Sequence, residues 1–168
     1  FSMDGTIAPL PDLLRLAQEH HAWRIIDDAH GRGALGAAGA GCADLFGVQQ
    51  AQRLIIMGTL GKAAGLSGAF VVAPAAVIDW LVQAARPYIY TTASSPAMAH
   101  AICASVDLMR GDEGIARRLQ LDLLIQTLRS SLQQLLHTAP AHWQLAPSST
   151  AIQPLIVGDN ASALQLSA

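Results

Sequence analysis

The chain has 168 residues, of which 52% are hydrophobic and 13% are charged, a composition that supports a folded core and excludes a disordered tail. Its formal net charge is -2, which gives no electrostatic basis for binding nucleic acid. No apolar run reaches the roughly 18 residues of a membrane span, because Pro, Gly, Arg and Asp interrupt each one.

Apolar periodicity predicts alternating helices and strands along the chain. The segment 9–20 has an apolar stripe at helical spacing and a proline near its start, which is typical of an amphipathic helix. A short buried strand, 22–26, then ends in the sequence DDAH, and a glycine-rich loop follows over 31–47. Beyond this loop the predicted elements are strands 53–59 and 68–73, helix 74–86, strand 88–92, helices 96–109 and 113–137, strand 151–159, and a further helix that starts near the end.

The predicted strands are continuous apolar runs rather than alternating ones. Such runs are typical of strands buried on both faces, so we expect an α/β fold with a mostly parallel sheet flanked by helices. Ligands of such sheets bind at the carboxyl ends of the strands. Polar residues follow three of the predicted strand ends: Asp27, Asp28 and His30 after the first, Thr59 and Lys62 after the second, and Tyr90, Thr91 and Thr92 at the end of 88–92.

Lys62 lies in a glycine-rich segment, GTLGKAAGLSGA, directly after an apolar strand. The segment is not a phosphate-binding loop of the GxxxxGK[ST] type, because only two residues separate its first glycines and Ala63 follows the lysine. Two interpretations remain open. The lysine is either solvated in a turn, or it is an activated amine that forms a Schiff base with a carbonyl group.

The sequence HHAWRIIDDAH contains several residue types that bind metals, but it does not predict a metal site. His20 and His21 lie about seven residues from Asp27, which is roughly 20 Å of extended chain, so one metal ion cannot bridge them. These histidines are expected at the C-terminus of the first helix. The two cysteines, Cys42 and Cys103, have no CxxC spacing, which argues against a zinc ribbon or a disulfide framework and favours a reducing compartment, the cytoplasm.

The polar residues at the strand ends form one consistent site if Lys62 holds pyridoxal phosphate. The pyridine nitrogen of this cofactor needs an anionic partner to remain protonated, and Asp27 supplies a carboxylate at a strand end. His30 or Ser2 can donate to the phenolic oxygen of the ring, and Thr59 can bind the phosphate. The hypothesis rests on these residue types and on their placement.

The segments DDAHGRG, TLGKAAGLSGA and AIQPLIVGDN resemble those of the α-oxoamine synthases, which are fold-type-I enzymes dependent on pyridoxal phosphate. The likeness runs from FSMDG through MRGDEG to IVGDN and so covers nearly the whole chain. It implies that Lys62, Asp27 and His30 are catalytic and bind the cofactor: Lys62 bonds to it, and Asp27 is the partner of the pyridinium nitrogen. It also implies that His30 and Ser2 lie near the phenolic oxygen and that Thr59 contacts the phosphate.

The same resemblance implies a homodimer, in which Thr91 and Thr92 reach the phosphate bound by the neighbouring subunit. Residues 1–110 then correspond to the second half of the large cofactor-binding domain, and residues 111–168 to the beginning of an incomplete C-terminal domain. Because the chain begins with FSMDG and ends with NASALQLSA, we expect it to be an internal fragment that is inactive by itself.

Within the family, IQPLIVGDN points to the member that acts in biotin biosynthesis. This likeness implies the decarboxylative condensation of L-alanine with pimeloyl thioester, carried by CoA or by a carrier protein, with Lys62 as the base that removes the α-proton. One alternative is a sibling reaction, such as that of glycine acetyltransferase. Another, for the fragment alone, is a catalytically silent dimerisation piece.

Overall fold

The computed structural model describes residues 1–48 and 52–167. The chain divides into two compact units. One unit is Pro9–Ala116, and the other combines Phe1–Ala8 with Arg117–Ala168. None of the described helices is long and apolar enough to cross a membrane.

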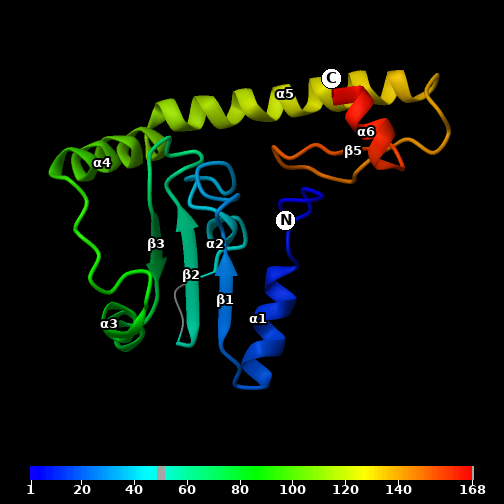
Figure 1. The fold of residues 1–168 in the computed structure, drawn as a ribbon. Coiled ribbons are helices and arrows are strands. Elements are labelled where there is room, and N and C mark those ends of the chain that lie inside the picture. Colours follow the sequence, from blue (N-terminus) through cyan, green and yellow to red (C-terminus); the bar gives the residue numbers. More distant parts are fainter. Residues whose placement is uncertain (49–51, 168) are drawn as a thin grey trace. The chain divides into compact units, whose positions relative to one another are not determined.

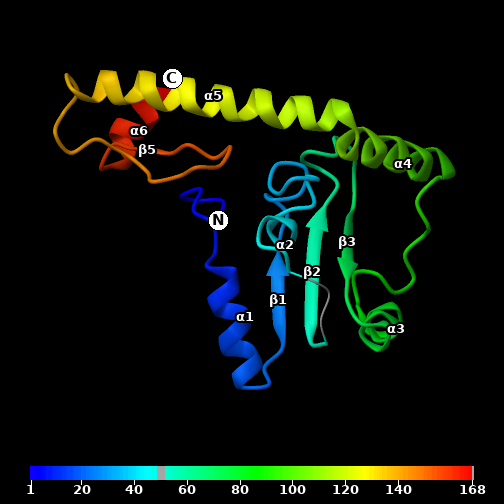
Figure 2. The same cartoon turned by 180° about the vertical axis from the view of Figure 1, so that it is seen from behind.

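The unit Pro9–Ala116 contains a three-stranded sheet with the order β1-β2-β3 (Figure 1, Figure 2). Strands β1 and β2 are parallel, with Asp27 opposite Met57, whereas β2 and β3 are antiparallel, with Gly58 opposite Phe70. The elements of this unit are α1 (Leu10–Glu19), β1 (Arg24–Asp27), α2 (Cys42–Leu45), β2 (Leu54–Thr59), β3 (Ala69–Val72), α3 (Ala75–Ala84) and α4 (Pro96–Arg110).

The expected α/β class is confirmed, but the sheet is mixed rather than mostly parallel. The physical reason is the length of the connection between β2 and β3. Only residues 60–68 join these strands, and a parallel neighbour needs a crossover of about a dozen residues or more. The chain therefore turns back, and the amide of Leu60 donates to the carbonyl oxygen of Gly68 at 2.9 Å to close the reversal.

The strand predicted over 88–92 does not form, and this prediction is wrong. The amides of Tyr88 and Ile89 both donate to the carbonyl oxygen of Ala85, so the chain leaves α3 in tight turns. Tyr90 has a φ of 64° and is 98% exposed, which leaves it without a neighbouring strand among the described residues. The apolar residues of YIYTT suggested a strand, but these turn hydrogen bonds hold residues 85–91 out of the extended conformation.

The predicted helices 9–20, 74–86, 96–109 and 113–137 are confirmed, as is the further helix predicted near the end, which is α6 (Asn160–Ser167). Helix α4 illustrates why the sequence was informative: Ser95 caps it by accepting from the amide of Met98 at 3.3 Å, and Pro96 occupies its first turn. Helix α5 (Asp112–Leu136) begins directly after Gly111 and has two acidic residues, Asp112 and Glu113, in its first turn.

The second unit, Phe1–Ala8 with Arg117–Ala168, contains most of α5, the strands β4 (Gln144–Leu145) and β5 (Leu155–Ile156), and α6 (Asn160–Ser167). The long strand predicted over 151–159 is reduced to the two residues of β5, which pair antiparallel with β4. Ser148, which is 3% exposed, donates to the carbonyl oxygen of Gly5 at 3.0 Å. This hydrogen bond ties the first residues of the chain to the segment between β4 and β5.

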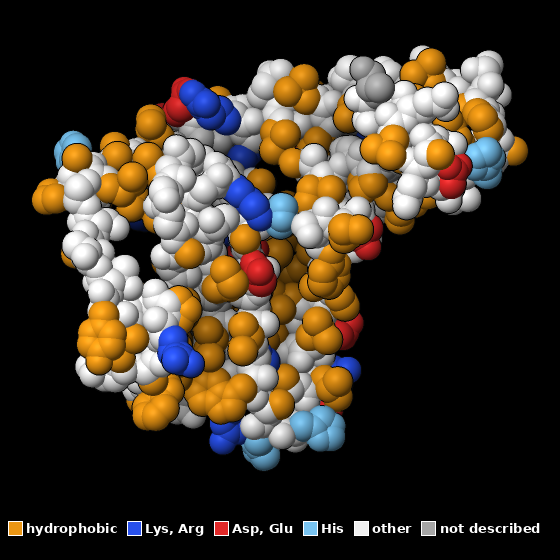
Figure 3. Space-filling model, viewed as in Figure 1, with side chains coloured by type: hydrophobic (Ala, Val, Ile, Leu, Met, Phe, Trp, Pro, Cys, Tyr) orange, Lys and Arg blue, Asp and Glu red, His pale blue; other side chains and the backbone are white. Residues whose placement is uncertain are grey.

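Few apolar side chains are fully buried in the unit Pro9–Ala116. Its buried apolar residues are Leu10, Ala29, Leu54 and Ile56. Hydrophobic side chains instead gather on the face of this unit drawn in Figure 3, over and beside the strands. Most of the fixed geometry therefore comes from the sheet ladder and from the loops at its edge, which form the candidate site.

Candidate functional site

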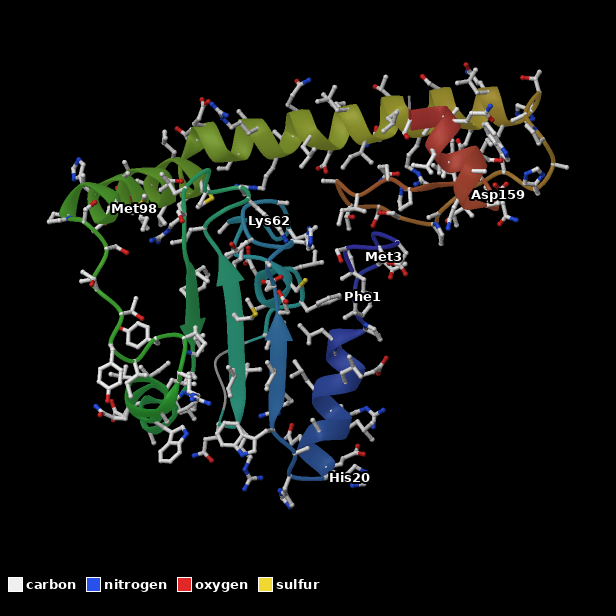
Figure 4. All side chains as sticks on the ribbon, viewed as in Figure 1. Phe1, Met3, His20, Lys62, Met98 and Asp159 are labelled. Atoms are coloured by element: carbon white, nitrogen blue, oxygen red, sulfur yellow. The ribbon has the colours of Figure 1, made fainter. Side chains whose placement is uncertain are left out.

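The ends of β1 and β2 bring the predicted residues of the first two strands to one edge of the sheet. Because the two strands are parallel, Asp27 and Thr59, their last residues, lie at the same edge. Figure 4 shows Lys62 in the loop beyond the end of β2, and His20 at the opposite end, after α1. Among the described residues, 1–48 and 52–167, no group of three or more His, Cys, Asp or Glu can hold a metal ion.

Asp27 and Asp28 are neighbours with opposite environments. Successive side chains of an extended segment point to opposite sides, so only one of the two can face the interior. Asp27 is exposed, and its Oδ1 accepts from the amide of Ala29 at 3.0 Å. Asp28 is 1% exposed and is among the most buried side chains of the chain. Asp27 is thus available to a ligand, whereas Asp28 belongs to the interior.

The carboxylate of Asp28 holds the glycine-rich loop. Its Oδ1 and Oδ2 accept from the amide of Cys42 at 3.1 and 3.0 Å, and Oδ2 lies 3.3 Å from Nε of Arg32. This last contact is an ion pair rather than a directed hydrogen bond, because Nε has no hydrogen-bond partner among the described residues. Gly31 and Gly41 approach the carboxylate so closely that a Cβ on either would collide with it.

Arg32 connects this loop to the sheet. Its guanidinium carbon lies 5.5 Å from the centre of the Phe70 ring, within the range of a cation–π contact. Phe70 in turn covers Gly58, the residue opposite it in β2, where an added Cβ would come within 2.9 Å of Cε1 of the ring. Asp28, Arg32, Phe70 and Gly58 are therefore in continuous contact from the end of β1 to β2 and β3.

A second carboxylate holds the other side of the same loop. Oδ2 of Asp44, in α2, accepts from the amides of Ala38 and Ala40 at 2.9 and 3.4 Å. Arg32 and Ala40 form an isolated β-bridge between them. The loop therefore has a defined fold without regular secondary structure, because backbone amides are paired with carboxylates.

Lys62 lies at the tip of the reversal between β2 and β3. Its carbonyl oxygen accepts from the amide of Gly65 at 2.9 Å, and its side chain is exposed. The hydroxyl of Thr59 stabilises the base of this loop, since it accepts from the amide of Gly61 at 3.1 Å and donates to the carbonyl oxygen of Gly68 at 3.3 Å. The lysine therefore projects from a fixed turn, with its amine free in the described structure.

The glycine-rich loop and the Lys62 loop touch at Gly33. This residue has a φ of 80°. A Cβ added there would collide with Cβ of Ala63 and lie 3.2 Å from Sδ of Met109. On the other side of the lysine, Oγ of Ser105, in α4, donates to the carbonyl oxygen of Ala64 at 2.8 Å. Contacts from the loop and from α4 thus fix the two residues that follow Lys62.

The other predicted site residues lie in different places. His30 is exposed in the turn after β1, where the amides of Gly31 and Arg32 both donate to the carbonyl oxygen of Asp28 at 3.1 Å. Thr91 and Thr92 are exposed in the connection between α3 and α4, and Oγ1 of Thr91 donates to the carbonyl oxygen of Pro87 at 3.1 Å. Ser2 is exposed and belongs to the other unit. Within the unit Pro9–Ala116, the residues Asp27, His30, Thr59 and Lys62 therefore lie at one edge of the sheet, whereas Thr91 and Thr92 lie in the connection between α3 and α4.

Sequence reasoning missed the residues that support the site, above all Asp28, Arg32 and Phe70. The sequence did contain a signal for Asp28, because the side chains of adjacent residues at a strand end point to opposite sides. One of Asp27 and Asp28 therefore had to face inward. Phe70 had no signal in the sequence, because its contact with Gly58 depends on the antiparallel register of β3.

Cys42 shares the environment of Asp28. Burial, followed by the hydrogen bonding and the charge of Asp28, raises the pKa of the Cys42 thiol from 9.0 to about 12. The thiol is thus neutral at physiological pH, and it is a poor nucleophile despite lying near the candidate site.

A hollow lies away from this edge. It has a volume of about 380 Å³ beside the C-terminus of α1, with His21, Arg24 and Arg53 among its lining residues. Its arginines serve the backbone: Nη1 of Arg53 donates to the carbonyl oxygen of His21, and Nε of Arg24 to that of Arg53. We therefore assign the hollow a structural origin and place the chemistry at the sheet edge.

Comparison with known proteins connects this arrangement to a family. The family model "Aminotransferase class I and II" matches residues 1–168. The chain is 59% identical to "8-amino-7-oxononanoate synthase" of Polaromonas naphthalenivorans (strain CJ2) and 58% identical to the protein of that name from Cupriavidus taiwanensis. Both matches cover the whole chain but only 41% of the relative, so the chain spans about two fifths of the length of these relatives.

Solved structures with the same fold are similar to the chain at lower identity. The 8-amino-7-oxononanoate synthase from Francisella tularensis matches with a TM-score of 0.77 and 27% identity, over 99% of this chain and 47% of that one. The Sphingomonas wittichii serine palmitoyltransferase matches with a TM-score of 0.76 and 27% identity, over 99% of this chain and 40% of that one.

The contact at Gly33 can be tested with a matched pair of substitutions. Gly33→Ala combines a positive φ with a collision against Ala63, whereas Gly47 has a φ of 62° and, among the described residues, no atom within 4 Å of an added Cβ. We expect Gly47→Ala to cost about 1–2 kcal/mol of stability from the left-handed backbone alone. Gly33→Ala should cost about 1–3 kcal/mol more from overpacking, as measured by urea unfolding. Equal losses would show that the two loops are not in contact.

The raised pKa of Cys42 predicts a loss of stability at high pH. In the unfolded chain the thiol ionises above about pH 9, whereas in the folded chain it stays protonated up to about pH 12. Between these values the unfolded state has released more protons, so the free energy of unfolding falls as the pH rises. Unfolding curves from pH 8 to 11 should show this slope, and Cys42→Ala should reduce it. An unchanged slope in Cys42→Ala would assign the effect to other groups.

Proposed function

Because the chain belongs to the aminotransferase class I and II family, we propose that it is part of an enzyme that requires pyridoxal phosphate. The proposed reaction condenses L-alanine with a pimeloyl thioester, with loss of CO2, to give 8-amino-7-oxononanoate in cytoplasmic biotin biosynthesis. One observation carries the proposal. Asp27, at the end of β1, and Lys62, in the loop after β2, lie at the same edge of the sheet. The names of the relatives at 58% and 59% identity support the choice of reaction.

The residues at the edge fit the chemistry of this cofactor. Lys62 is the only lysine in the sequence, and it supplies a primary amine that can bond covalently to an aldehyde. Asp27 supplies an exposed carboxylate for a protonated ring nitrogen, and His30 an exposed imidazole for the phenolic oxygen. When bound, pyridoxal phosphate stabilises negative charge that develops on the carbon attached to the substrate's amino group.

Each residue then has a defined task in the proposed reaction. The carboxylate of Asp27 holds a proton at the ring nitrogen, which favours the electron-withdrawing form of the ring. The amine of Lys62, when not bonded to the cofactor, would be the base that takes the proton from the α-carbon of alanine. The hydroxyl of Thr59 already forms hydrogen bonds with the backbone of Gly61 and Gly68. We therefore assign it mainly to orienting the Lys62 loop, and in addition to binding the phosphate.

A sibling reaction is the second candidate, and one observation separates the two. The likeness to serine palmitoyltransferase extends to the fold, with a TM-score of 0.76, but the identity is only 27%. The likeness to proteins named 8-amino-7-oxononanoate synthase reaches 60%. We further propose that the chain is an internal part of a longer enzyme, since it spans 41% of these relatives, and that residues outside it complete the binding of both substrates.

The covalent role of Lys62 can be tested in the longer enzyme. After incubation with pyridoxal phosphate, borohydride reduction should fix the cofactor to the peptide that contains Lys62, as identified by mass spectrometry. Lys62→Arg keeps the positive charge but cannot react with the aldehyde, so the label should disappear from this peptide and turnover should fall by several orders of magnitude. A label that persists on another peptide with full turnover would overturn the assignment.

We also propose a homodimer in which Thr91 and Thr92 contact the cofactor phosphate of the partner subunit. Both threonines are exposed and lie away from the chain's own Lys62 loop, which supports a role in trans. Mixed dimers of a Lys62→Ala chain with a Thr91→Val, Thr92→Val chain should regain about a quarter to a half of the activity, because one intact site re-forms. The control is the mixture of each variant with itself. A mixture that forms dimers but shows no recovery would place the threonines in their own subunit's site.

A further inference from the structure

We propose that Asp28 is a positioning residue, which holds the Asp27–His30 turn in register with the Lys62 loop through its buried carboxylate. The proposal rests on the proposed function, and it assigns a task to a charged side chain that the reaction itself does not use. Asp28 is 1% exposed, so it cannot serve as a surface carboxylate. Burying a charge costs desolvation free energy, which hydrogen-bond donors and a paired cation must offset.

The first part of the connection runs through the backbone on either side of His30. The main-chain carbonyl of Asp28 accepts from the amides of Gly31 and Arg32 at 3.1 Å, so His30 lies within a turn that Asp28 closes. The side chain of Asp28 then fixes the end of that turn, because it pairs with Arg32 at 3.3 Å and leaves no room for a Cβ at Gly31. Asp28 thus holds His30 without touching it.

The second part of the connection reaches the lysine. The amide of Cys42 donates to both oxygens of Asp28, which clamps the far end of the glycine-rich loop to the end of β1. Between these clamped ends, Gly33 contacts Ala63, the residue that follows Lys62. Arg32 supports the same arrangement from the sheet side through its contact with Phe70.

The turn that carries His30 and the loop that carries Lys62 therefore share one support. A change at Asp28 is expected to move His30 relative to Lys62 and to leave the sheet ladder intact. Asp44 provides a matched comparison, since it also holds loop amides by its carboxylate but contacts Ala38 and Ala40 rather than the turn.

The test is a double-mutant cycle in the longer enzyme, read out as the dissociation constant of pyridoxal phosphate for the folded apoprotein. Asp28→Asn and His30→Asn should each weaken binding about tenfold, and the double variant should be weakened little more than either single variant. This non-additivity distinguishes a residue that acts through His30 from one that merely lowers global stability. Asp44→Asn combined with His30→Asn should give losses that multiply, because Asp44 does not hold the turn.

Arg32→Gln provides a second route if Asp28→Asn does not fold. It removes the ion pair but leaves the hydrogen bonds from Cys42 to Asp28, and it should show the same non-additivity with His30→Asn. Multiplying losses for both Asp28→Asn and Arg32→Gln would overturn the positioning role while leaving the proposed function intact. Failure of the unchanged enzyme to bind pyridoxal phosphate at Lys62 would overturn the proposed function, and the positioning role with it.

Discussion

The buried carboxylate of Asp28 is the constraint on which the edge of the sheet depends. An uncompensated charge in the interior costs several kcal/mol, so the chain around Asp28 must supply donors. The backbone amide of Cys42 and the guanidinium of Arg32 do so, and both come from the glycine-rich loop. Glycines at 31 and 41 follow from the same requirement, because no larger residue lets the backbone approach the carboxylate closely enough. The glycines at these two positions are thus explained by one charge.

Much of the fold could be predicted from the sequence because its signals are local. Helices such as α4 are defined by a serine cap, a proline and helical periodicity, all within one stretch of chain. The direction of β3 and the absence of a strand over 88–92 depend instead on a short connection and on turns that apolar periodicity does not reveal. The apolar run of β3 suits either direction, and only the short connection 60–68 decides it. The hydrophobic residues of YIYTT indicated a strand, but turns after α3 override that preference.

Some residues of the candidate site could likewise be predicted from the sequence, and others could not. Asp27, Thr59 and Lys62 could be placed together because parallel strands end at a common edge, which needs no side-chain detail. The residues that orient them could not, because a contact such as that of Phe70 with Gly58 exists only once the register is known. Spacing along the chain therefore identifies residues that could react or bind a ligand. The residues that orient them become apparent only from three-dimensional packing.

The pair Asp27 and Asp28 shows how one strand end can serve both purposes. The two carboxylates belong to consecutive residues. Because side chains alternate in an extended segment, one carboxylate points toward solvent and the other points inward. If the strand end were turned by one residue, Asp27 would lose its exposure and Asp28 would lose its contacts with the loop. A single carboxylate cannot satisfy both demands, because the carboxylate that holds the loop is 1% exposed and therefore out of reach of a ligand. Two adjacent acidic residues are therefore the shortest sequence that gives this edge a free anion and a fixed loop.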